Sequence, residues 1–150
     1  MRRYNLTGTI AVMASSYKSA LSIAATATSV ATIYDFSVGT SGTPADNSTQ
    51  WEAIRMSGTV GTSTASTPNP LEANDGAATC IGATNYTAEQ GTPGTILFGP
   101  LDLNMRATYR WVAAPGGELY TPPTAANTIN LRSQSAAYTG ISDCHAHFWE

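Results

Sequence analysis

Three residues near the carboxyl end have types and spacing that suit metal binding: Asp143, His145 and His147. Alternate residues of a β-strand share one face, so the two imidazoles could contact one ion with the carboxylate beside them. A zinc site needs further ligands, however, and the chain has no other histidine. Cys144 would point to the opposite face, and Cys80 is distant in the sequence. We therefore expect two partly exposed histidines on a sheet face or edge, and no metal or cofactor.

Patterns typical of nucleophilic or acid–base catalysis are weaker still. The stretch GTSTA at residues 61–65 is superficially similar to the segment around the nucleophile of subtilisin-like proteases, but both histidines lie at the far end of the chain. That chemistry needs a histidine that accepts the serine proton and a carboxylate that orients it. Glycosidase chemistry needs two acids about 5–9 Å apart, and no spacing selects a pair from Asp35, Glu52, Asp102 and Glu118. We expect a protein that is not an enzyme.

The composition is that of a single, weakly charged domain. A chain of 150 residues fits one domain, which buries roughly 68–70% of its unfolded surface. Charged residues make up only 11% of the chain, against about 25% in typical proteins. The net charge of −3 and the few, scattered Lys and Arg residues exclude nucleic-acid binding through counterion release. No apolar run approaches the roughly 20 residues of a membrane-spanning helix, so we expect neither nucleic acid nor membrane as a partner.

Alternation with a period of two predicts the elements that must position these residues. Gly and Pro separate the alternating segments, and no segment keeps a helical period. About eight or nine short strands of this kind predict an all-β, jelly-roll-like β-sandwich. We interpret residues 1–16 as an extended N-terminal arm and residues 17–150 as the single sandwich domain. The expected strands fall at residues 17–23, 29–38, 48–58, 59–64, 92–100, 105–113, 118–123, 127–133 and 141–150, with a brief strand or a turn of helix at 79–87.

One aromatic-rich stretch contains two arginines at strand spacing. In MRATYRWVAAPGGELYTPP, residues 105–123, Arg106 and Arg110 are four residues apart. They would therefore share one face of a strand, with a Tyr and a Trp on the other face filling the core. Two interpretations stay open: the arginines bind acids of a partner, or they pair with Glu118 or Asp102 within the chain.

The same stretch carries a family resemblance. LNMRATYRWVAAPGGELYTPPTAANTINLR at residues 103–132, with ADNSTQWEAIRMSGTVGTSTASTPNPLE at 45–72 and CHAHFWE at 144–150, resembles a group of small tailed-phage virion proteins. These act as capsid cement or decoration proteins, and the similarity runs from about Ser29 to the C-terminus. The resemblance implies a jelly roll or related β-sandwich that forms homotrimers at threefold and quasi-threefold positions. It further implies binding to the major capsid protein on the outside of the virion, after assembly in the bacterial cytoplasm.

Five residues are candidates for the contact surface of such a protein: Arg106, Arg110, Glu118, Phe148 and Trp149. The chain is too poor in charge to bind a shell by electrostatic attraction alone. We therefore expect the aromatic C-terminus and the N-terminal arm to be contact elements.

Three other functions remain open. A tail or baseplate protein would use a similar trimeric sandwich. A secreted carbohydrate-binding module would use the tryptophans Trp51, Trp111 and Trp149, and three Asn-X-Thr/Ser sequences occur, beginning at residues 5, 47 and 85. A jelly-roll hydrolase or cupin-like metal protein would rest on the two histidines. The first residues imitate a signal peptide only weakly, Met13 is a possible alternative start, and Cys80 and Cys144 fit one disulfide or two free thiols.

The arm hypothesis makes a direct prediction. Deleting residues 1–16 should weaken occupancy of the capsid and leave the β-fold intact, as measured with sub-saturating protein. Unchanged occupancy would contradict a role of the arm in binding.

Overall fold

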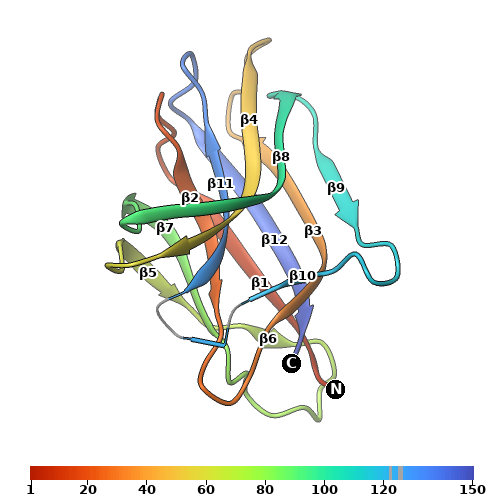
Figure 1. Ribbon diagram of the computed structural model, residues 1–150. Helices are drawn as coiled ribbons and strands as arrows, with labels where there is room; N and C mark the ends of the chain where they lie inside the picture. The colour runs from red at the N-terminus through yellow and green to blue at the C-terminus, as the bar shows by residue number, and fades with distance from the viewer. Residues whose placement is uncertain (122, 125–126) are drawn as a thin grey trace.

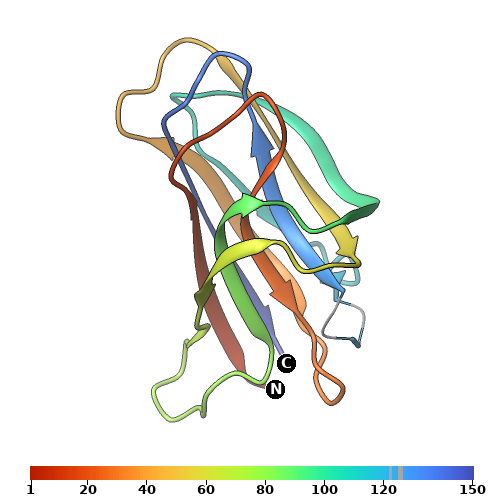
Figure 2. The ribbon, with the colours of Figure 1, turned by 90° about the vertical axis from the view of Figure 1, so that its left-hand side faces the viewer.

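Two antiparallel β-sheets pack face to face in the computed structural model, which describes residues 1–121, 123–124 and 127–150 (Figure 1). The side view separates the two layers and places both chain ends at one end of the sandwich (Figure 2). These residues contain no helix, and hence none that is long and apolar enough to cross a membrane. The predicted all-β sandwich is confirmed.

The strands largely coincide with the segments that alternate in the sequence. The short run at 79–87 is a strand and not a turn of helix, and β9 is shorter than the alternating segment around it. The strands are β1 Arg3–Ile10, β2 Lys18–Ala24, β3 Thr32–Ser41, β4 Ser48–Ser57, β5 Thr62–Ser66, β6 Asn69–Pro70, β7 Ile81–Ala88, β8 Thr92–Asn104, β9 Tyr109–Val112, β10 Leu119–Tyr120, β11 Thr128–Gln134 and β12 Ile141–Trp149.

The strand order is that of a jelly roll. The first sheet has the order β10-β3-β12-β1-β6, with β9 also paired to β3. The second sheet has the order β5-β7-β2-β11-β4-β8. The chain passes from one sheet to the other at each step from β1 to β4, then from β5 to β6, β6 to β7, β8 to β9, β10 to β11 and β11 to β12. Eight of these strands therefore form two interlocked Greek keys, with β5 and β7 added at one edge of the second sheet.

The core lies between the sheets and is closed at one edge by aromatic rings. Phe36 of β3 stacks on Trp111 of β9 with ring centroids 5.0 Å apart. Phe98 of β8 meets Phe36 edge to face at 5.5 Å. The aromatic residues 109 and 111 thus face the core, as predicted. Phe36 is only 2% exposed, and full burial of such a side chain contributes about 1.5–3 kcal/mol through removal of its surface from water.

Strand β1 corrects the prediction of an N-terminal arm. Arg3–Ile10 pairs with β12 over its whole length, from Arg3 opposite Trp149 to Ile10 opposite Ser142. Tyr4, Leu6 and Ile10 face the core and are almost completely buried. The alternation of these apolar residues with Asn and Thr marks a half-buried strand, but the glycine at position 8 interrupts it in the sequence. Residues 3–10 therefore belong to the sandwich, and the domain does not begin at residue 17.

A bulge in β3 interrupts the strict alternation of faces along this strand. The sequence alternation puts Ile33 and Phe36 on opposite sides, yet both are buried in the core. The register between β3 and β12 shifts at His147 and Phe148, so that Tyr34 is the extra residue on β3. A β-bulge places two residues of one strand opposite one residue of its partner, and it restores the inward direction of the apolar side chains on both sides of Tyr34.

The outer face of the second sheet is largely covered by the protein's own polar contacts. The Glu52 carboxylate accepts a hydrogen bond at 2.5 Å from Nε of Arg132, whose guanidinium lies over the Tyr17 ring. Glu89, between β7 and β8, accepts hydrogen bonds from the backbone N–H and the hydroxyl of Ser19. Buried polar groups with satisfied hydrogen bonds make such a network rigid.

Leu6 tests whether β1 is a core strand. The Leu6→Ala variant should lower the free energy of unfolding by about 2–5 kcal/mol, because it leaves a cavity between the sheets. The matched Thr7→Ala variant changes an exposed neighbour and should shift stability by less than about 0.5 kcal/mol. Urea denaturation measures both. A chain that lacks residues 1–10 and still unfolds cooperatively would contradict this assignment.

Candidate functional site

The outer face of the first sheet gathers the most chemically distinctive side chains of the chain. Strand β12 is central in this sheet, between β1 and β3, and its residues alternate. Cys144, Ala146 and Phe148 point into the core. The alternate residues therefore lie on the outer face, where Asp35, Ser37 and Arg110 from β3 and β9 meet them. We define the histidine face as this surface, formed by Tyr34, Asp35, Ser37, Arg110, His145, His147 and Trp149.

Asp35 is the buried centre of the histidine face. Only 2% of the residue is exposed. Arg110 binds the carboxylate with both ends of its guanidinium: Nε lies 3.0 Å from Oδ1, and Nη2 lies 2.6 Å from Oδ2. Nδ1 of His147 lies 3.2 Å from the same Oδ2. The hydrogen bonds from Arg110 lower the pKa of Asp35, and those from His147 lower it further, against the opposing effect of burial.

The two histidines lie side by side on β12. Their ring centroids are 5.1 Å apart, and the planes are inclined by 41°. Nδ1 of His145 lies 3.1 Å from the Ser37 hydroxyl oxygen on β3. Burial lowers the pKa of His145, and the neighbouring His147 lowers it further. Each ring is therefore held through its Nδ1 atom by a residue of the adjacent strand.

An aromatic pair continues the face toward the end of the molecule where the termini lie. Tyr34 stacks on Trp149 with ring centroids 4.8 Å apart and planes at 18°. The other neighbour of Tyr34 is His147, with ring centroids 6.1 Å apart. Tyr34 reaches this face because it is the bulged residue of β3. The bulge thus builds a half-exposed aromatic surface next to the Asp35 ion pair.

The arrangement differs from a serine-type catalytic triad. In such a triad a single imidazole contacts both the carboxylate and the nucleophilic hydroxyl. Here His147 contacts Asp35, whereas His145 contacts Ser37. The two contacts therefore lie on different rings.

Two of the five predicted contact residues lie on the histidine face. Arg110 is exposed and pairs with Asp35, which replaces both of the acids considered as its intramolecular partners. Trp149 is half-buried and stacks on Tyr34. Phe148 is a correction: it is fully buried and stacks on Tyr4, its cross-strand neighbour on β1 in the same sheet. It cannot be a contact element, because the residue after His147 on a strand points to the opposite side.

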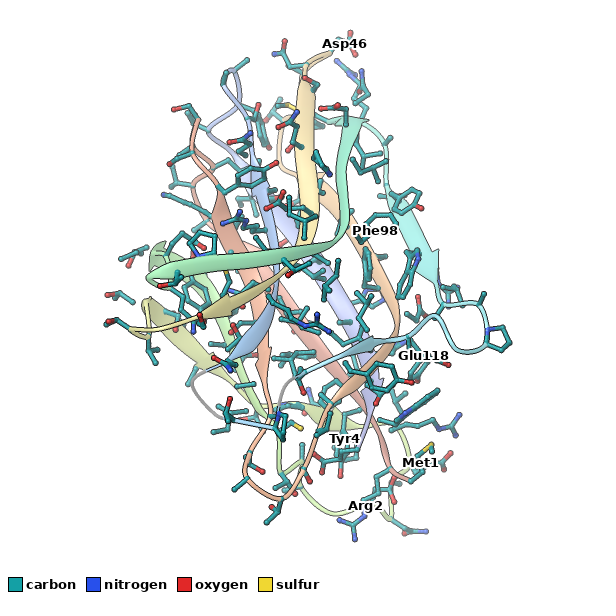
Figure 3. The ribbon with its side chains drawn as sticks, viewed as in Figure 1. Met1, Arg2, Tyr4, Asp46, Phe98 and Glu118 are labelled. Atoms are coloured by element: carbon teal, nitrogen blue, oxygen red, sulfur yellow. The ribbon has the colours of Figure 1, made fainter. Side chains whose placement is uncertain are left out.

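Arg106 lies away from this face. Strand β9 begins only at Tyr109, so Arg106 belongs to the turn after β8 and does not share a strand face with Arg110. It pairs with Asp46, Nε to Oδ1 at 2.8 Å, at the end of the molecule opposite the termini (Figure 3). Glu118 is half-buried directly before β10. The single polar strip predicted for the two arginines is therefore wrong.

The tryptophans do not form one exposed platform. Trp51 is buried in the core, and Trp111 stacks against Phe36 on the inner side of β9. Of the glycosylation-like sequences, Asn5 lies on β1 with a side-chain oxygen that is buried, and the Asn85 oxygen accepts a hydrogen bond from the Ala11 backbone. Because Trp51 and Trp111 face the interior, the three tryptophans do not form the shared aromatic surface that the carbohydrate-binding interpretation requires.

The remaining candidate residues are separated from one another. Among the described residues, no group of three His, Cys, Asp and Glu side chains is placed to hold a metal ion. Asp143 accepts a hydrogen bond from the Ser41 hydroxyl at 2.5 Å. Cys80 and Cys144 are free and buried, and burial raises the pKa of Cys80 to about 12 and also raises that of Cys144. The GTSTA stretch forms most of the edge strand β5.

Sequence reasoning missed the central role of Asp35. In the sequence, Asp35 is one of four acids from which no pair could be selected. Its partners Arg110 and His147 lie 75 and 112 residues away in the sequence, on β9 and β12. Only the pairing of both strands with β3 brings these side chains together.

Comparison with known proteins adds no relative: no family model, no curated protein and no solved structure matches the chain.

Asp35 makes stability depend on pH in the acid range. Because its folded pKa is lowered, the ionised carboxylate stabilises the fold above the pKa of the unfolded chain, about 3.9. This contribution is lost as the pH falls through the folded pKa. The difference in unfolding free energy between the wild type and Asp35→Asn should be present at about pH 5 and shrink below about pH 4. Urea denaturation across this range measures it, and a difference independent of pH would contradict the assigned ion pair.

Proposed function

We propose that this protein is a non-enzymatic structural component of a tailed-phage virion, a decoration protein that binds the outside of the capsid as a homotrimer. Two lines of support exist. The residues of three segments resemble such proteins, and the histidine face has the composition of a protein-binding surface. The second line carries the proposal: Tyr34 and Trp149 are half-buried aromatic residues next to the exposed Arg110. Aromatic residues and arginine are enriched in the regions of interfaces that contribute most binding energy.

The jelly roll supplies a stiff support for this face. Its central strand β12 is paired on both sides along its length, to β1 and to β3. A rigid surface loses little conformational entropy on binding, so more of the contact energy appears as affinity. The low charge of the chain, with a net value of −3, allows copies to crowd on a shell without strong mutual repulsion.

Trimerisation would multiply modest contacts into firm attachment. Once one subunit of a trimer binds the shell, the other two bind at a high effective concentration, and the overall affinity exceeds that of one contact by orders of magnitude. A protein that binds the assembled shell, and not its separate subunits, stabilises the shell by mass action. In this proposal the major capsid protein is the partner, and the protein acts in the virion after assembly in the bacterial cytoplasm.

The role of the histidine face is tested with Trp149→Ala. Loss of a central aromatic contact should weaken binding to capsids of the encoding phage about tenfold or more. Val60→Ala is the matched control: it truncates an exposed apolar side chain in the connection between β4 and β5 and should leave binding unchanged. Occupancy is measured by co-sedimentation of capsids with sub-saturating protein, and both variants are checked for unchanged unfolding.

Electron microscopy of the virion decides between capsid and tail. The proposal expects density for this chain on the icosahedral lattice and a trimeric mass in sedimentation equilibrium. Density in the tail or baseplate, or a monomer that binds no capsid, would overturn it. An equal loss of capsid binding in both variants would overturn the role of the histidine face alone.

A further inference from the structure

The two histidines of β12 are arranged like metal ligands in which a second hydrogen bond, at the ring nitrogen that does not bind the metal, fixes the orientation of the ring. A metal-binding histidine usually holds one ring nitrogen on a carboxylate, carbonyl or other polar group and offers the second nitrogen to the ion. Here Nδ1 of His147 lies 3.2 Å from the Asp35 carboxylate, and Nδ1 of His145 lies 3.1 Å from the Ser37 hydroxyl. In both rings Nε2 is the nitrogen without these contacts.

The contact with Asp35 also selects the tautomer that a metal requires. A carboxylate only accepts hydrogen bonds, so a neutral His147 must carry its proton on Nδ1 and present a lone pair at Nε2. The Ser37 hydroxyl oxygen can accept a hydrogen bond from the Nδ1–H of His145, which gives the second ring the same tautomer. The side chain of His147 is 26% exposed, so its ring is within reach of an ion in solution.

The spacing of the two rings fits one tetrahedral ion. A zinc ion about 2.0–2.1 Å from a ring nitrogen lies about 3.2 Å from that ring's centroid. Two such rings at a tetrahedral angle then have centroids about 5 Å apart. The observed separation of His145 and His147 is 5.1 Å. The centroid spacing of these two rings thus matches that of two imidazoles bound to one tetrahedral ion.

The surrounding charges do not oppose a cation. The guanidinium of Arg110 is the nearest positive group, and it is bound by both oxygens of Asp35. On the other side, the residues of β1 opposite the two histidines are the uncharged Thr7 and Asn5. The exposed Asp143 lies two residues before His145 on the same strand face. The local balance of charge is therefore neutral to slightly negative.

We propose that His145 and His147 form a two-imidazole binding site for a divalent transition metal such as Zn²⁺ on the histidine face. Two protein ligands leave the other positions of a tetrahedral ion to water or to a side chain of a bound partner. The site is thus an open one, suited to metal-assisted contact between molecules. Imidazole favours Zn²⁺, Ni²⁺ and Cu²⁺ over Mg²⁺ and Ca²⁺, which prefer oxygen ligands.

The chain is convenient for a test because it contains only two histidines. Their ring signals in an NMR spectrum report on each imidazole separately during a titration with ZnCl₂ at pH 7.5. The proposal expects both rings to shift with one common midpoint and a stoichiometry of one Zn²⁺ per chain. MgCl₂ at the same concentrations should shift neither ring.

Two variants and a control identify the ligands. His145→Gln and His147→Gln should each weaken Zn²⁺ binding at least tenfold, measured by calorimetry, while Asp102→Asn, which removes an exposed acid from β8, should leave it unchanged. Binding of Zn²⁺ without a shift of the imidazole signals, or with full affinity in either histidine variant, would overturn the site. Because these measurements need no capsid, their outcome is independent of the proposed virion function.

Discussion

The pairing of β12 between β1 and β3 is the interaction on which the rest of the structure depends. It holds Ala146 and Phe148 in the core and therefore holds His145 and His147 on the opposite face. A slip of one residue along either neighbour would turn the apolar side chains into water and the histidines into the core. The core thus determines the register, and the register determines the chemistry of the surface. Both proposals for this protein rest on that single alignment.

Parts of this arrangement could be predicted from the sequence, and the limits have physical reasons. Regular alternation in β2, β11 and β12 revealed these strands, because one face of each is apolar. The same rule failed where the backbone departs from strict alternation: the bulge at Tyr34 returns Ile33 to the core. It also failed at β1, where Gly8 replaces an apolar side chain. A Cβ at Gly8 would lie 2.4 Å from the Ala20 carbonyl oxygen, so close packing of β1 on β2 explains the glycine.

The site could be predicted only in part. The histidine pair was visible, because its spacing lies within one strand. Its partners Asp35 and Ser37 were not, because they come from a strand more than 100 residues earlier. Arg106 and Phe148 were wrongly assigned, since the faces of their segments depended on where β9 begins and on which side of β12 meets the core. Local patterns therefore identify side chains with chemical potential, while strand pairing decides which of them meet.

The two outer faces of the sandwich differ in how their polar and aromatic side chains are arranged. On the second sheet, Glu52 with Arg132 and Ser19 with Glu89 satisfy one another at close range. On the first sheet, polar contacts are made beneath the surface by Asp35, while aromatic rings and imidazoles stay partly open to solvent. One face is internally complete, and the other is organised for contact. The two faces of the sandwich therefore differ in how much of their polar and aromatic surface is open to solvent.

The meeting of the two chain ends has a consequence for engineering. Arg2 and Glu150 are joined by reciprocal backbone hydrogen bonds of 3.1 Å, so the polypeptide is already almost a ring. A short Gly-Ser linker would close it, and new ends could be opened at an exposed tip such as the Pro115–Gly117 turn. Cargo fused at residues 1 and 150 would project from a single end of the sandwich, next to Trp149, whereas cargo fused at relocated ends would leave that end free.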